Sequence, residues 1–266
     1  MDHPALGPPR LWPVFVAYLV AFVSIVALSL VAAGLLREMY PDVPDHALFD
    51  GLPGLVAGAL ASSTALALTV ALFNRPLELA LLRLVPGWET GRALAVMIVG
   101  MLALGQALDS LAVLAGLGDK GAPAAIRSAL AAAAGPELFL AVLVIGVLVG
   151  SAEELFFRGY MQTRLGQRVP PALAVVVTSL AFGLLHLEWI HALLAFVLGL
   201  YLGWITEVAG SALPAIACHV INNALFTVLT ALVGTVAGAG PNAALLAGCG
   251  CVFVGAVVWL RRCRTW

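Results

Sequence analysis

Residues 11–36 read LWPVFVAYLVAFVSIVALSLVAAGLL and contain no charged side chain. A helix needs about 20 mostly apolar residues to cross the hydrocarbon core of a bilayer. The run is also much longer than the apolar part of a cleavable signal peptide. It therefore predicts a transmembrane helix at the start of the chain.

The rest of the chain has the same character, since 62% of its residues are hydrophobic and only 10% are charged. Soluble domains have about 45–50% apolar and about 25% charged residues. So much apolar surface indicates a lipid bilayer as the main surroundings. The net charge of −1 gives no sign of a nucleic-acid partner, and the four cysteines lack metal-binding spacing and are interpreted as packing residues.

Eight apolar stretches are long enough to be membrane spans or large parts of them. We therefore expect an all-α polytopic integral membrane protein of about eight transmembrane helices, whose last five form a helical core that carries the site. A turn is expected at 238–242, which contains Gly238, Gly240 and Pro241. The predicted spans are 14–36, 52–73, 93–117, 138–157, 172–187, 192–205, 213–233 and 243–260.

Basic residues predict the orientation, because they are enriched on the cytoplasmic side of membrane proteins. Only Arg37, Lys120 and Arg127 fall on one predicted side. The other side, which includes both termini, should therefore be cytoplasmic in a multi-pass protein of the cell (inner or plasma) membrane. Its ten basic residues are Arg10, Arg75, Arg83, Arg92, Arg158, Arg164, Arg168, Arg261, Arg262 and Arg264.

Polar residues gather in the second half of the chain. Inserting an ionisable side chain at the centre of a membrane helix costs about 2.5–3.5 kcal/mol of free energy. Each such residue therefore calls for a structural or functional explanation. The first half offers little beyond Gln106, Asp109 and Ser110. The second half contains Glu153, Glu154, Arg158, His186, His219, Asn222 and Asn223.

The segment 151–159 contains two adjacent carboxylates. Glu154 and Arg158 are four residues apart, so they lie on one helix face and can pair. Glu153 lies about 100° around the helix and has no local partner. A lone carboxylate in a low-dielectric site is suited to be a general base. The alternative is that both acids mark a solvated helix end.

Two histidine motifs follow. His186 shares a helix face with Phe182, and it could equally be a core histidine bonded to a carbonyl group. His219 and Asn223 are i, i+4 neighbours, with Asn222 nearly as close. A histidine and an asparagine can donate hydrogen bonds towards one point, as an oxyanion hole requires. They could also serve only as interhelical hydrogen-bonding groups.

Together these motifs resemble those of the CPBP family of intramembrane proteases. That family, also called Abi, comprises CAAX prenyl endopeptidases and bacteriocin-processing relatives. The similar region runs from about 137 to 229. The matching motifs, in the family's order, are Glu153-Glu154-x-x-x-Arg158, Phe182-x-x-x-His186 and His219-x-x-x-Asn223.

The resemblance implies roles for these residues. Glu153 would be the catalytic carboxylate and His186 would help it to activate water. His219 and Asn223 would stabilise the oxyanion. The supporting residues would be Glu154, Arg158, Phe182 and Asn222.

The same resemblance leaves the cofactor open. The family is often described as metalloproteases, although a metal-free glutamate mechanism is also proposed for its eukaryotic members. If a metal is present, Glu153, His186 and His219 could bind Zn²⁺. We expect no tightly bound metal, because Asn223 suits an oxyanion hole better than a zinc shell.

The expected function is an intramembrane endopeptidase acting on a membrane-associated peptide or protein, of CAAX or leader-peptide type. The alternatives are a non-catalytic membrane chaperone or immunity protein, and a proton-coupled transporter. A transporter usually has internal repeats, which are not evident in this sequence. The expected division is 1–130 for three N-terminal transmembrane helices, 131–235 for a CPBP-like catalytic core, and 236–266 for the last helix and a basic cytoplasmic tail.

The turn at 166–171 also predicts the depth of the site. Glu153 and His186 are equally far from it, so an antiparallel helix pair brings them level. The first helix of the pair should then continue past Arg158, the second should end near His186, and 187–191 should be irregular.

Two protease-like patterns are rejected. His186 and His191 are five residues apart, whereas the zinc motif H-E-x-x-H needs histidines four apart. The Gly116–Asp119 stretch resembles an aspartyl protease motif but falls in a predicted loop, with Asp109 as its nearest acidic partner.

Overall fold

The computed structural model describes residues 11–263, so Arg10 and Arg264 of the orientation prediction lie outside the described part. Throughout these residues the regular structure is helical, which confirms the all-α polytopic prediction. The helices are α1 (Trp12–Met39), α2 (Asp45–Phe49), α3 (Leu52–Phe73), η1 (Leu79–Leu82), α4 (Gly91–Leu114), α5 (Gly121–Leu130), α6 (Gly135–Ala141), η2 (Val142–Val149), α7 (Gly150–Glu154), η3 (Leu155–Gln162), α8 (Thr163–Gly166), α9 (Pro171–Leu185), α10 (Trp189–Ala209), α11 (Leu213–Leu232) and α12 (Ala239–Cys263).

Seven helices of the described chain are long and apolar enough to cross a membrane. One of them is the continuous helix 135–166, which comprises α6, η2, α7, η3 and α8. The remaining predicted span, 172–187, corresponds to α9, which has only 15 residues. At 1.5 Å per residue it is about 22 Å long, less than the roughly 30 Å of hydrocarbon. It ends immediately before His186, as predicted from the turn at 166–171.

Two local predictions were wrong. The irregular segment predicted at 187–191 is shorter, because α10 already begins at Trp189. The Glu188 carboxylate accepts hydrogen bonds from the backbone N–H groups of Ile190 and His191, which starts the helix early. The turn predicted at 238–242 instead covers 233–238, and α12 begins at Ala239.

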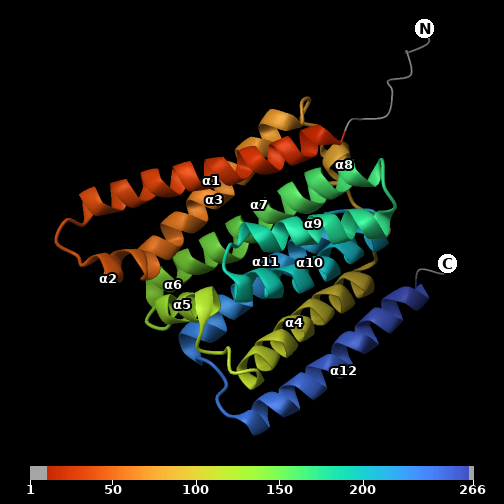
Figure 1. Ribbon diagram of the computed structural model, residues 1–266. Coiled ribbons are helices and arrows are strands. Elements are labelled where there is room, and N and C mark those ends of the chain that lie inside the picture. Colours follow the sequence, from red (N-terminus) through yellow and green to blue (C-terminus); the bar gives the residue numbers. More distant parts are fainter. Residues whose placement is uncertain (1–10, 264–266) are drawn as a thin grey trace.

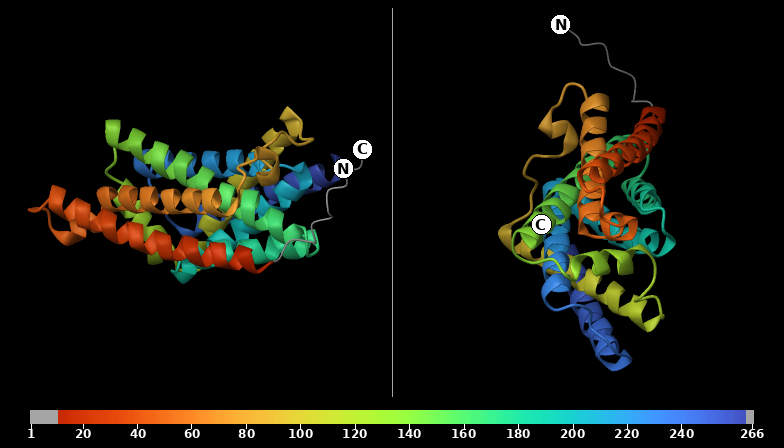
Figure 2. Two further views of the ribbon diagram at one scale, coloured as in Figure 1. Left: turned by 90° about the horizontal axis from the view of Figure 1, so that it is seen from above. Right: turned by 90° about the vertical axis from the view of Figure 1, so that its left-hand side faces the viewer.

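The helices form a bundle with two outer pairs (Figures 1 and 2). The pair α1 and α3 lies on one side, and the pair α4 and α12 lies on the other. Between them are the helix 135–166, α9, α10 and α11. The first residues of α1 and the last residues of α12 lie at the same end of the bundle.

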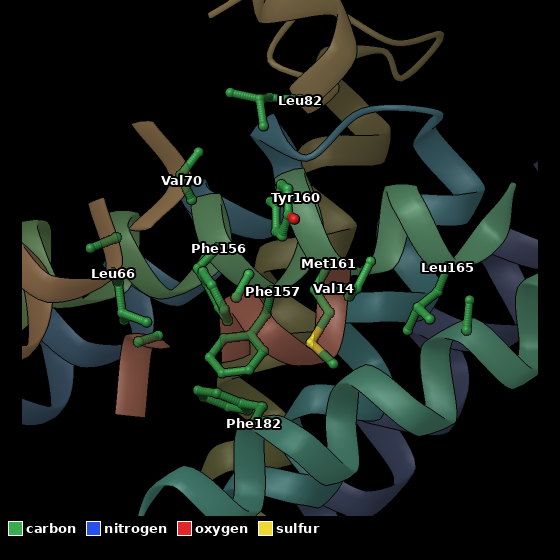
Figure 3. Packing of buried hydrophobic residues seen from close by; sticks show 14 of the residues in the cluster. Val14, Leu66, Val70, Leu82, Phe156, Phe157, Tyr160, Met161, Leu165 and Phe182 are labelled. Atoms are coloured by element: carbon green, nitrogen blue, oxygen red, sulfur yellow. The ribbon is translucent and has the colours of Figure 1, made fainter. Parts of the chain in front are cut away.

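An aromatic cluster anchors the η3 part of the central helix (Figure 3). Phe157 packs edge-on against Phe156 at 5.0 Å and against Phe182 of α9 at 5.1 Å between ring centroids. Val14 of α1 and Leu66 of α3 belong to the same buried cluster. The first two spanning helices therefore support the helix that carries both glutamates.

Two glycines let α11 approach this central helix closely. A Cβ atom on Gly150 would lie 3.1 Å from the backbone nitrogen of Val220, and one on Gly146 would lie 3.0 Å from Cα of Ala224. Small residues four apart commonly allow such contacts between membrane helices. Val220 directly follows His219, so this contact determines how far that histidine stands from the glutamates.

We therefore expect Gly150→Leu to destabilise the protein by about 1–3 kcal/mol, the usual cost of overpacking a close contact. Thermal unfolding of the purified protein in detergent would measure the change. Gly58→Leu in α3 is the matched control, because a Cβ atom there meets nothing within 4 Å. Equal melting temperatures for the two variants would contradict the proposed importance of this contact.

Candidate active site

Both glutamates lie on α7, a short α-helical segment between the π-helical segments η2 and η3. Each π-helical segment widens the helix and changes the direction of the side chains that follow. Such segments occur frequently at functional sites. The composition of this helix did not predict the two π-helical segments.

Glu154 is the buried centre of the site. Its Oε1 accepts a hydrogen bond from Nη1 of Arg158 at 2.8 Å and another from Nδ1 of His219 at 2.8 Å. The side chains of Glu154 and Arg158 are both fully buried. The expected pair between Glu154 and Arg158 is therefore present, whereas the bond to His219 was not anticipated.

Arg158 also connects this helix to α10. Its Nη2 donates to the carbonyl oxygen of Gly199 at 2.9 Å, and Gln162, one turn later, donates to that of Gly203 at 3.0 Å. A Cβ atom on Gly199 would lie only 3.1 Å from Nη2 of Arg158. Our sequence interpretation missed Gln162 and both glycines, although Gly199-x-x-x-Gly203 was a readable signal of close helix contact.

Glu153 is adjacent to the same histidine from the other side. Its Oε2 lies 3.6 Å from Nε2 of His219, and 12% of its side chain is exposed. It interacts electrostatically with both His219 and His186. The histidine therefore stands between the two carboxylates, bonded to Glu154 and facing Glu153.

His186 follows the last residue of α9 and is held by its neighbours. Its Nδ1 lies 2.9 Å from the carbonyl oxygen of Phe182. A carbonyl group can only accept, so Nδ1 donates and Nε2 carries the lone pair of the neutral ring. Ring centroids lie 5.0 Å away for Phe182 and 4.2 Å away for His191. The Phe182 ring also lies 5.9 Å from that of His219, which connects the two imidazoles.

The two asparagines differ in their surroundings. Nδ2 of Asn223 donates to the carbonyl oxygen of Ile145, within η2, at a long 3.4 Å. Asn222 instead has its Oδ1 against α4, 2.8 Å from where a Cβ atom on Gly105 would be. Asn223 thus faces the helix of the glutamates, while Asn222 lies against a different one.

The predicted metal ligands do not form a metal site in this geometry. Among residues 11–263, no three His, Cys, Asp or Glu side chains are placed so that they could hold a metal ion. The arrangement therefore does not fit a zinc shell of Glu153, His186 and His219.

The rejected motifs have structural roles. Asp109 forms an ion pair with Arg127 at 3.1 Å, which ties α5 to α4. Glu188 bonds the first backbone N–H groups of α10 and also that of Ala122 in α5. Neither carboxylate is arranged as a protease motif would need.

The fold and this cluster define a polytopic helical membrane protein with carboxylate, guanidinium and imidazole groups gathered between its helices. Residues 135–225, about a third of the chain, match the family model described as Type II CAAX prenyl endopeptidase Rce1-like. The match contains every predicted site residue, and it confirms the resemblance of this region to the CPBP family of CAAX-type proteases. No curated protein and no solved structure matches the chain.

Replacing Glu154 should be costly, because Glu154→Gln leaves the buried Arg158 without its counter-charge. Breaking a buried ion pair typically costs about 3–5 kcal/mol. We expect a loss of that size in the free energy of unfolding, measured by chemical denaturation of the purified protein.

Asp45→Asn is the control, since its ion pair with Arg37 is exposed to solvent and should contribute about 1 kcal/mol or less. If Glu154→Gln were no worse than this control, Glu154 would not be the structural centre of the site.

Proposed function

We propose that this protein is an intramembrane endopeptidase that hydrolyses a peptide bond by means of a water molecule activated by Glu153. The observation that carries the proposal is a carboxylate inside the bundle, 3.6 Å from an imidazole whose other nitrogen is fixed by Glu154. The substrate would be a membrane-associated peptide or protein of CAAX or leader-peptide type. The protein would lie in the cell membrane with both termini in the cytoplasm.

In the first step Glu153 takes a proton from water. Nε2 of His186 carries the lone pair of its ring and can accept the second hydrogen of the same water. Holding the water at both hydrogens directs its oxygen towards the carbonyl carbon of the substrate. General-base assistance of this kind contributes about 10²–10⁴ to a rate.

His219 and Asn223 would stabilise the negative oxygen that forms next. Nδ1 of His219 donates to Glu154, so the ring can donate through Nε2 only as an imidazolium. The two carboxylates beside it favour that charge state, because buried negative charges need balancing. When His219 is an imidazolium, the formal charges of the cluster sum to zero. The cluster comprises Glu153, Glu154, Arg158 and His219. Nδ2 of Asn223 would exchange its long bond to Ile145 for one to the oxyanion.

Collapse of the intermediate completes the reaction. The proton held by Glu153 passes to the departing amine nitrogen as the C–N bond breaks. The products are a carboxylic acid and an amine, and Glu153 returns to its charged form. Water is the only co-reactant.

Glu153→Gln should abolish cleavage and leave the fold intact, because the amide keeps the shape but cannot accept the proton. The measurement is a quantitative comparison of peptides and new N-termini in membranes from cells with wild-type protein or the variant. This also identifies substrates. Glu137→Gln, an exposed position on the same helix, is the control and should retain activity. Near-full activity in Glu153→Gln, with clean loss in a folded Glu154→Gln, would reverse their roles.

With a substrate in hand, Asn223→Ala should lower kcat about 10²–10³-fold, the usual cost of losing one oxyanion donor. Asn222→Ala should have a smaller effect, because its side chain lies against α4. Steady-state kinetics on the purified protein would compare them. Equal and slight effects would mean that these asparagines only hold helices together.

A further inference from the structure

A groove lies on the surface between α4 and α12, the outer helix pair away from α1 and α3 (Figure 1). It has a volume of about 320 Å³ and its lining is almost wholly apolar. On α4 it is lined by Ala95, Val96 and Val99, and on α12 by Val252, Gly255, Ala256 and Trp259. A long hydrocarbon chain fits a groove of this chemistry.

Arginines continue the groove beyond one end. Arg92 precedes Ala95 and Val96 by three and four residues, so it lies on the same face of α4. Arg262 follows Trp259 by three residues and continues the corresponding face of α12. Both arginines are exposed, as is part of Trp259. Tryptophan and arginine at a helix end are typical of the boundary between hydrocarbon and headgroups.

The register of the two helices brings these arginines level. A Cβ atom on Gly100 would lie 3.3 Å from Cβ of Ala256, so these residues face each other. The helices are antiparallel, so Arg262 is opposite position 94. That level is two residues from Arg92, or about 3 Å along the axis. Two cationic groups therefore stand over the same end of the groove.

We propose that this groove binds a phospholipid with an anionic headgroup. One acyl chain would lie between α4 and α12, and the phosphate and its headgroup would meet Arg92 and Arg262. Arginine suits this task because its planar fork pairs with two phosphate oxygens at once. Basic pockets between membrane helices are a recurring mode of recognition of such lipids.

A second groove in the same protein has the apolar part without the cationic end. It lies between α1 and α3, has a volume of about 310 Å³ and is lined by residues such as Leu28, Ala57 and Thr64. The nearby Arg37 is outnumbered by acidic residues, namely Glu38, Asp42 and Asp45, so this end carries no net positive charge. It should accept lipid chains without preference for headgroup charge, which makes it an internal control.

The test is lipid binding to the purified full-length protein by native mass spectrometry, with dioleoyl-phosphatidylglycerol and dioleoyl-phosphatidylcholine as probes. We expect tighter binding of the anionic lipid. Arg92→Gln should reduce that preference about fivefold, as one arginine near a lipid surface contributes. Gly255→Leu, which fills the groove, should abolish the preference. Ala57→Leu in the other groove should leave it unchanged.

Equal binding of both lipids to the wild-type protein would overturn the proposal. So would a preference that survives both Arg92→Gln and Gly255→Leu. If Gly255→Leu altered the oligomeric state in light scattering and left the lipid preference intact, the groove would be a contact between two copies. None of these outcomes depends on proteolytic activity, so the proposed function is tested separately.

Discussion

The site depends on one carboxylate oxygen, Oε1 of Glu154, which accepts hydrogen bonds from Arg158 and His219. A charge buried among apolar helices costs several kcal/mol unless it is paired and hydrogen-bonded. The two donors come from different elements, since Arg158 lies on η3 and His219 on α11. Arg158 in turn bonds the backbone of α10 at Gly199. Satisfying a single buried charge therefore fixes three helices relative to one another, and the face of His219 turned to Glu153 follows from that arrangement.

Glycine makes these bonds geometrically available. Arg158 reaches a carbonyl oxygen on α10 because Gly199 has no side chain in the way, and Gln162 does the same at Gly203. On the opposite side, Gly150 lets the backbone of α11 come close enough for His219 to bond Glu154. In a membrane, apolar helices have little reason to prefer one another over lipid, so close packing and interhelical hydrogen bonds provide the specificity. In this protein the close helix contacts at glycine and the interhelical hydrogen bonds occur at the same positions.

Much of this architecture could be predicted from composition alone. Apolar runs predicted the approximate limits of α9 and of the seven helices long enough to span, but not the short helices α2, η1 and α5. The turn before Pro171 correctly predicted that α9 stops beside His186. The exact start of α10 could not be predicted, because it depends on the side chain of Glu188 bonding its own following backbone. The π-helical segments could not be predicted from the hydropathy pattern. For the site, i, i+4 spacing was enough to predict the pair of Glu154 and Arg158, which lie on one helix. The bond from His219 to Glu154 crosses 65 residues of sequence, and no local rule identifies it.

Charge balance separates the endopeptidase interpretation from the transporter alternative. In the proposed mechanism His219 is an imidazolium, and two carboxylates, one guanidinium and one imidazolium would be neutral together inside the bundle. In the proposed reaction Glu153 would accept a proton from water, so the cluster would gain one positive charge as the attacked carbonyl oxygen became negative. The centre of the reaction would stay neutral at every step, and no charge would have to be created alone in a low dielectric. A proton relay has the opposite need, since its groups must change charge in turn while the ion passes through. Glu154 is held in place by Arg158 and His219, which suits it to position His219 for the proposed hydrolysis.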